Sequence, residues 1–178
     1  EATVEEFDEE SLREQYEQFL DAAQETEKQA LVIDGEVQKD LAVKYASCCN
    51  PIPGDEVFGF VSKTGTVNIH RSNCRNASDL LVNKADRILD VDWSHQKDVQ
   101  FVAALRLMGE DRVGMVNDIT TVISKNLKTN IRSITIDTED GIFSGTIMLH
   151  VSDLEHLQRL IERLKRIDGI QGVYRFKE

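Results

Sequence analysis

Three cysteines and one histidine are the residues of this sequence whose types and spacing could bind a metal. Cys48 and Cys49 are adjacent, and His70 is followed four positions later by Cys74. Three thiolates and one imidazole are an accepted ligand set for a tetrahedral structural zinc ion. The residues between the two pairs predict a β-hairpin, which could bring the pairs together. The spacing therefore predicts one structural zinc site.

The same four residues allow other interpretations, because adjacent cysteines are less typical of zinc sites than a C-x₂-C pair. Neighbouring side chains tend to diverge, so three buried reduced thiols and a surface histidine are the first alternative. A nucleophilic Cys–His pair is the second, although no orienting third group accompanies it. A catalytic zinc is not favoured, since four protein ligands leave no open position. The sequence has no phosphate-binding glycine loop and no H-E-x-x-H helix, and we predict no catalytic residues.

A second candidate site lies in residues 109–117, GEDRVGMVN, between a predicted strand and a predicted helix. Gly114 falls in the first helical turn, where glycine costs about 1 kcal/mol relative to alanine. Close approach of another backbone or of a small ligand would explain the glycine, and exposed N–H groups there suit a carboxylate. Packing of the helix against a sheet is the alternative. The functional hypothesis is an amino-acid pocket completed by a neighbouring protomer.

Hydrophobic patterning divides the chain into three parts that would position these sites. Residues 1–30 predict an acidic amphipathic linker helix. Residues 31–95 predict a small α/β module around the turn-rich segment CCNPIPGD, with strands at 31–33, 57–61, 66–69 and 88–93 and a helix at 77–85. Large apolar residues are few in this module, so it needs a staple.

Residues 98–178 predict a β-α-β-β-α-β order, which is that of a ferredoxin-like α+β fold. Apolar stripes predict helices at 116–127 and 154–164, the second with a capping box of Ser152 and Glu155. Alternation predicts the strands, the last of which carries Ile170, Gly172, Tyr174 and Phe176. Both helices should cover one face of a four-stranded antiparallel sheet.

The other face of this sheet and its edges would be left for a partner. On the third strand that face carries residues of mixed polarity, which are Ile142, Ser144, Thr146, Met148 and His150. This mixture suits a face that is covered only after association. Side-by-side dimerisation through a sheet edge is the preferred hypothesis.

The charge and composition exclude several classes of protein. The net charge of −11 comes entirely from residues 1–40, which hold 14 acidic and 3 basic side chains, so the rest of the chain is neutral. No apolar run approaches the ~20 residues that span a bilayer, and the acidic first residues do not suggest a signal peptide. Three cysteines are an odd number that fits a reducing compartment. We expect a cytoplasmic protein without membrane or DNA partners.

Two stretches of the sequence resemble known regulatory modules. Residues 45–76, YASCCNPIPGDEVFGFVSKTGTVNIHRSNCRN, resemble the zinc-finger or RIS module of long RelA/SpoT homologues, the (p)ppGpp synthetase/hydrolases of the stringent response. Residues 111–136, DRVGMVNDITTVISKNLKTNIRSITI, resemble the ACT domain at the end of the same proteins. The two modules occur in the family's order over roughly residues 40–178. The resemblance implies a non-catalytic C-terminal regulatory fragment of a GTP pyrophosphokinase, whose hydrolase and synthetase domains lie upstream.

The resemblance also implies partners and site residues. In this family the two modules help to dock the enzyme on ribosomal RNA and to restrain synthesis when amino acids are plentiful, and some members bind branched-chain amino acids. The cysteine/histidine cluster of the family matches Cys48, Cys49, His70 and Cys74. The RNA-binding expectation falls on Lys63, His70, Arg71 and Arg75. The amino-acid-binding expectation falls on Gly114, Met115, Asn117 and His150. The alternative function is an amino-acid-binding ACT dimer of a metabolic protein without ribosome binding.

Overall fold

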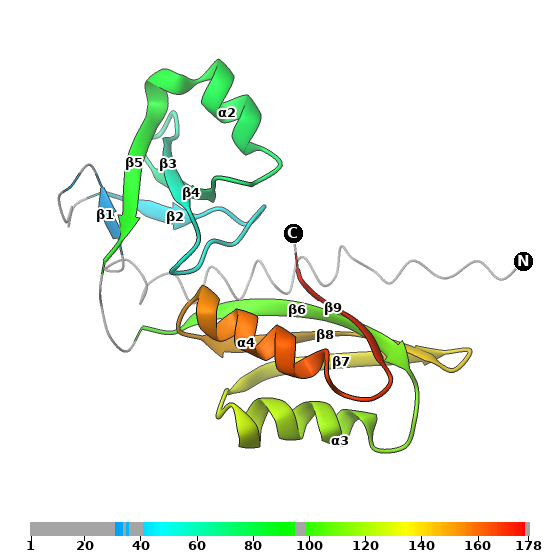
Figure 1. The fold of residues 1–178 in the computed structure, drawn as a ribbon. Helices are drawn as coiled ribbons and strands as arrows, with labels where there is room; N and C mark the ends of the chain where they lie inside the picture. Colours follow the sequence, from blue (N-terminus) through cyan, green and yellow to red (C-terminus); the bar gives the residue numbers. More distant parts are fainter. Residues whose placement is uncertain (1–30, 34, 36–40, 95–98, 177–178) are drawn as a thin grey trace, which may run out of the picture.

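The computed structural model describes residues 31–33, 35, 41–94 and 99–176, so the helix expected over 1–30 lies outside the described residues. Within the described ranges the chain forms two β-sheets, one after the other in sequence (Figure 1). Helices pack against these sheets, and strands outnumber them. The structure therefore confirms the predicted α+β class.

The first described sheet has the strand order β1-β5-β3-β4-β2, in which only the β2–β4 pair is parallel. Its strands are β1 (Leu31–Ile33), β2 (Val43–Tyr45), β3 (Val57–Val61), β4 (Val67–Arg71) and β5 (Ile88–Trp93). The sequence does not predict β2, because three residues are too short to show an alternating pattern. The strand predicted over 66–69 extends to Arg71 in the structure, so that His70 lies within β4 rather than after it.

The helix of this module is shorter than predicted. Helix α2 (Ala77–Asn83) ends at Asn83, because the φ of −140° and ψ of 37° of the C-cap residue Lys84 are not helical. A 3₁₀ turn, η1 (Ala85–Arg87), then leads into β5. The predicted helix over 77–85 therefore contains a change of direction that its composition does not indicate.

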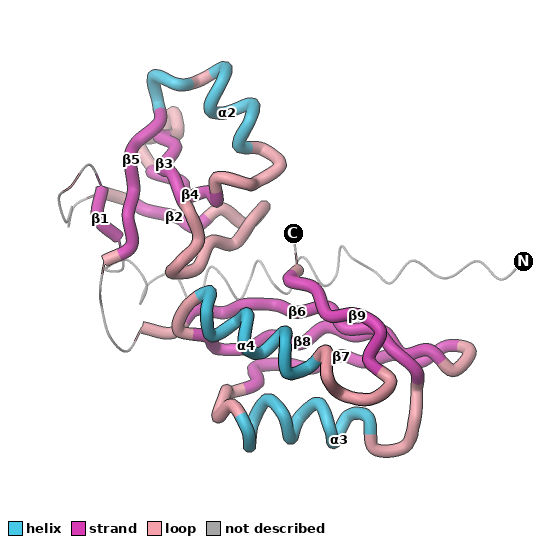
Figure 2. The backbone as a smooth tube through the Cα atoms, viewed as in Figure 1, coloured by secondary structure: helices cyan, strands magenta, loops and turns pink. Residues whose placement is uncertain are grey.

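The second described sheet is antiparallel throughout, in the order β7-β8-β6-β9. Its strands are β6 (Phe101–Glu110), β7 (Ile131–Glu139), β8 (Ile142–Val151) and β9 (Ile170–Arg175), and its helices are α3 (Met115–Thr120), continued by the π-helical turn η2 (Thr121–Asn126), and α4 (Leu154–Leu164). Both helices lie against the same face (Figure 2). The four-stranded sheet and the β-α-β-β-α-β order are as predicted.

Several local predictions for this sheet are corrected. Helix α3 buries Met115 instead of Val116, which is 48% exposed, because the helix begins one residue earlier than its apolar stripe indicates. Asp153, and not Ser152, is the N-cap of α4, and its Oδ1 accepts a hydrogen bond from the backbone N–H of His156 at 2.7 Å. In β9 Tyr174 is 55% exposed although it belongs to the predicted alternating set, whereas Val173 is 2% exposed.

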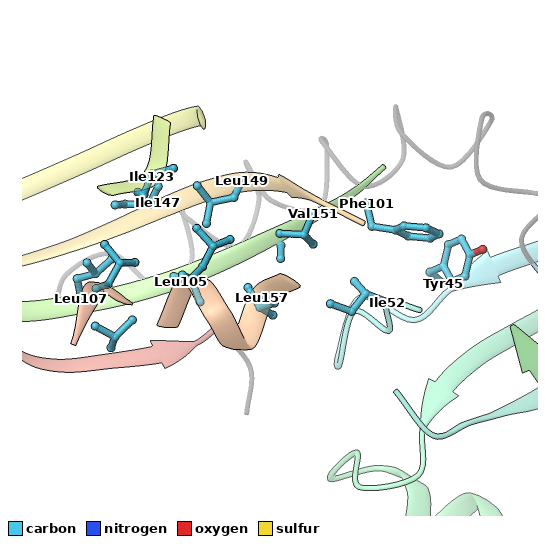
Figure 3. Packing of buried hydrophobic residues seen from close by; sticks show 14 of the residues in the cluster. Tyr45, Ile52, Phe101, Leu105, Leu107, Ile123, Ile147, Leu149, Val151 and Leu157 are labelled. Atoms are coloured by element: carbon cyan, nitrogen blue, oxygen red, sulfur yellow. The ribbon is translucent and has the colours of Figure 1, made fainter. Parts of the chain in front are cut away.

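The largest cluster of buried hydrophobic residues contains residues of both sheets. Phe101, on β6, packs edge-on against Tyr45 and Trp93 of the first sheet, with ring centroids 6.1 and 5.7 Å apart. The cluster continues through Ile52, which is fully buried, to Leu157 on α4 (Figure 3). The two sheets therefore share a core instead of packing as separate bodies.

The face of the second sheet opposite the helices is only partly exposed. At one end Val102, Ala104 and Met148 are at most 3% exposed and form a cluster with Phe176. At the other end the apolar side chains are exposed by 41–55%, and these are Met108, Ile142 and Tyr174. The expectation that this whole face is left for a partner is therefore wrong for the first end, where Met148 is buried.

Candidate metal centre

The structure brings the three cysteines and His70 together. Cys48 Sγ lies 3.5 Å from His70 Nδ1 and 3.4 Å from Cys74 Sγ, and Cys49 Sγ lies 3.9 Å from His70 Nδ1. All four ligand atoms lie within 4.8 Å of one another. Tetrahedral zinc with Zn–S bonds of about 2.3 Å requires sulfur atoms about 3.8 Å apart. The spacing of the four side chains is thus compatible with a tetrahedral zinc site.

A turn explains why the adjacent cysteines converge. The backbone N–H groups of Cys49 and Asn50 both donate to the carbonyl oxygen of Ala46, at 3.2 and 2.8 Å. In an extended strand, neighbouring side chains would point to opposite faces. In this turn the Sγ atoms of Cys48 and Cys49 lie 4.0 Å apart instead. The divergence expected of adjacent cysteines applies to strands and does not apply here.

The pKa values of Cys48 and Cys49 are shifted in opposite directions. The hydrogen bond with Cys49 lowers the pKa of Cys48 to about 3, although burial acts in the opposite direction, and hydrogen bonds with His70 and Cys74 lower it further. The same pairing with Cys48, together with burial, raises the pKa of Cys49. A thiolate is the form of cysteine that binds a metal. The lowered pKa of Cys48 thus favours the form of this side chain that binds a metal.

Backbone groups and an aromatic ring surround the cluster. The N–H of Arg71 donates to Cys49 Sγ at 3.4 Å, and the N–H of Asn76 donates to Cys74 Sγ at 3.5 Å. The ring of Phe58 stacks on His70, with centroids 5.6 Å apart. Hydrogen bonds and packing of this kind orient metal ligands and stabilise thiolates. The donor set and its surroundings fit a structural zinc ion.

The predicted RNA-binding residues lie in different environments. Lys63 and Arg75 are exposed, the first in the β3–β4 turn and the second next to Cys74. His70 and Arg71 are 8% and 4% exposed, and His70 belongs to the cysteine cluster. Of the four predicted RNA-binding residues, only Lys63 and Arg75 are therefore exposed at the surface.

The predicted amino-acid-binding residues do not form one site within the chain. Gly114 and Asn117 are exposed, whereas Met115 is buried in the core. His150 pairs with Val102 in the β6–β8 ladder, eight residues along the strand from the end that leads to Gly114. At about 3.3 Å per residue, roughly 26 Å of sheet separate His150 from this loop.

Gly114 has a conformational explanation. Its φ is +88°, and a Cβ at this position would meet only open space, with Arg112 Nη1 the nearest atom at 4.0 Å. No backbone of the described chain approaches this position closely, and approach by a ligand or a neighbouring protomer stays a prediction. Glycine is needed for the left-handed backbone at the start of α3.

The sequence does not predict a set of polar residues that joins the two sheets. Arg175 Nη1 and Nη2 donate to the two carboxylate oxygens of Asp55 at 2.9 and 2.8 Å, and the two side chains are 3% and 7% exposed. Arg175 Nη2 also donates to the carbonyl oxygen of Asn50, whose amide donates to the carbonyl oxygen of Val102. The signal in the sequence is an arginine between the apolar residues of a strand.

Comparisons with known proteins agree with this geometry. The family model of the RelA/SpoT RIS domain matches residues 31–94, and that of the ACT domain matches residues 97–175. The chain carries a RelA/SpoT RIS domain followed by an ACT domain. We use RIS module and ACT module below for these two matched ranges.

Full-length relatives carry the same two modules. The chain is 33% identical over 138 residues to the GTP pyrophosphokinase of Streptomyces coelicolor, covering 77% of this chain and 16% of the relative. It is 33% identical over 136 residues to the bifunctional (p)ppGpp synthase/hydrolase RelA of Mycobacterium tuberculosis, covering 76% and 18%. The chain thus spans less than a fifth of the length of these relatives. The similarity falls on their regulatory RIS and ACT domains and does not extend to a catalytic domain.

A solved structure is similar to the second half of the chain. The ACT domain from the GTP pyrophosphokinase of Chlorobium tepidum is 42% identical, covers 43% of this chain and 97% of its own, and has a TM-score of 0.40. In the described part of the chain, no helix has the length and apolar character needed to span a bilayer.

Proposed function

We propose that this chain is the C-terminal regulatory region of a cytoplasmic (p)ppGpp synthetase/hydrolase, which docks the enzyme on ribosomal RNA and controls its upstream catalytic domains during amino-acid starvation. The observation that carries the proposal is the four-ligand cluster of the RIS module, followed directly by an ACT module. A metal that stiffens a small module without supplying an open coordination position suits a recognition surface. One structural zinc, held by Cys48, Cys49, His70 and Cys74, is part of the proposal.

The RNA contact would use a few positioned groups instead of bulk charge. Residues 41–95 hold six basic and six acidic side chains, so their net charge is zero. Lys63 and Arg75 are exposed, and the guanidinium of Arg87 lies 4.5 Å from the ring centroid of Phe60. Exposed cations position a protein on phosphates, and aromatic or guanidinium planes stack on unpaired bases. These groups support an RNA-facing surface on the RIS module.

Co-sedimentation of the chain with ribosomes tests this proposal. The double variant Lys63→Glu, Arg75→Glu should lose ribosome binding while its circular dichroism stays unchanged, because both side chains are exposed. The control Lys125→Glu, Lys165→Glu changes two exposed lysines of the ACT module by the same net charge and should still bind. Equal co-sedimentation of the two double variants would contradict the proposed surface.

A second candidate function is amino-acid binding by an ACT dimer. Val113 is 100% exposed and precedes the exposed Gly114 and the start of α3, so an exposed apolar side chain lies beside exposed backbone at this loop. An amino acid could bind there with residues of a neighbouring protomer. Calorimetric titration with valine, leucine and isoleucine, with sedimentation at each step, tests it. Binding of an amino acid by a chain that does not associate with ribosomes would favour this candidate over the first.

A further inference from the structure

One loop of the RIS module contacts both the metal ligands and the ACT module. Residues 48–55, which we name the junction loop, begin with Cys48 and Cys49 and end with Asp55. The cysteines belong to the proposed metal site, and Asp55 forms the buried ion pair with Arg175. Only five residues of chain thus separate the metal ligand Cys49 from Asp55, which contacts the ACT module.

The middle of the junction loop is also held by the ACT module. The Asn50 side-chain amide donates to Val102 O at 2.9 Å, and the N–H of Leu154 donates to the carbonyl oxygen of Pro53 at 2.7 Å. Ile52 is fully buried in the shared core. Each of these contacts needs the loop backbone in one conformation.

The junction loop has little freedom to absorb a displacement at one end. Pro51 and Pro53 fix two of its φ angles. Asp55 Oδ2 accepts a hydrogen bond from the N–H of Ile52 at 2.8 Å, which closes the last turn. A change in the backbone of Cys49 is therefore passed on to the residues that contact the ACT module.

We infer that metal binding at the cysteine cluster controls how firmly the ACT module is docked on the RIS module, with the junction loop as the coupling element. The inference rests on the proposed metal site. Fixing a loop in one backbone conformation has an entropic cost. A metal that fixes Cys48 and Cys49 orders part of the junction loop before the ACT module docks, so docking then loses less entropy. Docking likewise orders part of the loop before the metal binds. The coupling is reciprocal by thermodynamic necessity.

Zinc affinity measured on the 178-residue chain tests the coupling from the ACT side. Competition with a chromophoric chelator gives the affinity of the wild type and of the ACT-module variants Arg175→Lys and Phe101→Leu, neither of which touches a cysteine. Both should bind zinc at least fivefold more weakly, the lower end of typical coupling between sites. The matched controls are Arg112→Lys, which alters an arginine paired with Asp118, and Phe143→Leu, which alters a buried ring at the far end of β8. The controls should bind zinc as the wild type does.

Hydrogen exchange tests the coupling from the metal side. Leu154 is the first residue of α4, where a backbone N–H has no partner within the helix, so its protection reports the bond to Pro53. Zinc should slow exchange of this amide in the wild type and slow it less in Arg175→Lys. If the wild type binds zinc but the affinities of all variants and the Leu154 exchange are unchanged, the coupling is refuted and the metal site stands. If the wild type binds no zinc, both are refuted.

Discussion

Replacement of Arg175 by methionine should reveal how much the buried ion pair contributes to folding. The guanidinium makes three hydrogen bonds, two to Asp55 and one to the carbonyl oxygen of Asn50, all between 2.8 and 2.9 Å. The side chains of the pair are 3% and 7% exposed, so water cannot take the place of the lost partner. Arg175→Met leaves the Asp55 carboxylate buried and unpaired except for the N–H of Ile52. Breaking a buried pair in this way costs about 3–5 kcal/mol.

A second substitution separates the cost of the unpaired charge from the loss of contacts. Asp55→Asn in the Arg175→Met background removes the buried charge and can keep the bond from Ile52. The double variant should therefore be more stable than Arg175→Met alone, although it carries one change more. This non-additive result is expected of residues in direct contact.

Urea unfolding at constant temperature measures both variants. Far-ultraviolet circular dichroism reports the whole fold, and the single tryptophan, Trp93, reports the junction because its indole N–H donates to the carbonyl oxygen of Asp55 at 2.9 Å. Arg175→Met should lower the free energy of unfolding measured in urea by about 3–5 kcal/mol. In a separate thermal scan, at about 2–4 °C per kcal/mol for a chain of this size, it should melt roughly 6–20 °C below the wild type. The exposed Arg159→Met is the control and should change stability by less than about 1 kcal/mol. A loss for Arg175→Met as small as that of the control would refute the reasoning.

Two further predictions concern the ACT module. Burial, with Arg159 nearby, lowers the pKa of His156, so the folded state binds fewer protons than the unfolded state as pH falls below about 6.5. The free energy of unfolding should therefore decrease on acidification from neutral pH towards pH 5. Urea unfolding at several pH values should show a smaller decrease for His156→Gln, and an equal decrease in the variant and the wild type would count against this role of His156. A Cβ on Gly109 would lie 2.2 Å from the carbonyl oxygen of Gly169, so Gly109→Ala should strongly destabilise the chain. The comparison variant Gly65→Ala, at an open turn of the RIS module with φ +82°, should cost only about 1 kcal/mol, and equal urea midpoints of the two variants would contradict this difference.

The sequence predicts most of the second sheet because its signals are local. The alternating residues Phe101, Ala103, Leu105 and Leu107 are all buried as predicted, although Val102 and Ala104 between them are buried as well. The turn at Asp140 and Gly141 has the positive φ angles of 49° and 77° that a hairpin of this type requires. The sequence does not determine where α3 begins, because Val116 and Met115 fit an apolar stripe equally well. Only the start of α3 decides between them.

The metal cluster could be predicted as a set of residues, but its geometry could not. The spacing of Cys48, Cys49, His70 and Cys74 indicates a ligand set, whereas the turn on Ala46 O that makes the adjacent thiols converge depends on backbone hydrogen bonds. The ion pair of Arg175 could not be predicted at all, because its partner Asp55 is 120 residues away in the sequence. A charge at a core-facing position of a strand predicts that a partner exists, but not which residue it is.

The contacts of the junction loop explain why a small module with a thin core can hold a defined surface. The cysteine cluster is covered by a separate group of buried residues, including Ala46, Phe58 and Ala77, which is distinct from the core shared with the ACT module. Without a metal this group has few large side chains to keep it folded. The junction loop joins it to the larger core, because Ile52 belongs to that core while Cys49 belongs to the cluster. With the proposed metal bound, the RIS surface that carries Lys63 and Arg75 is held from both sides, and loosening either the metal site or the ACT contact should disturb the other.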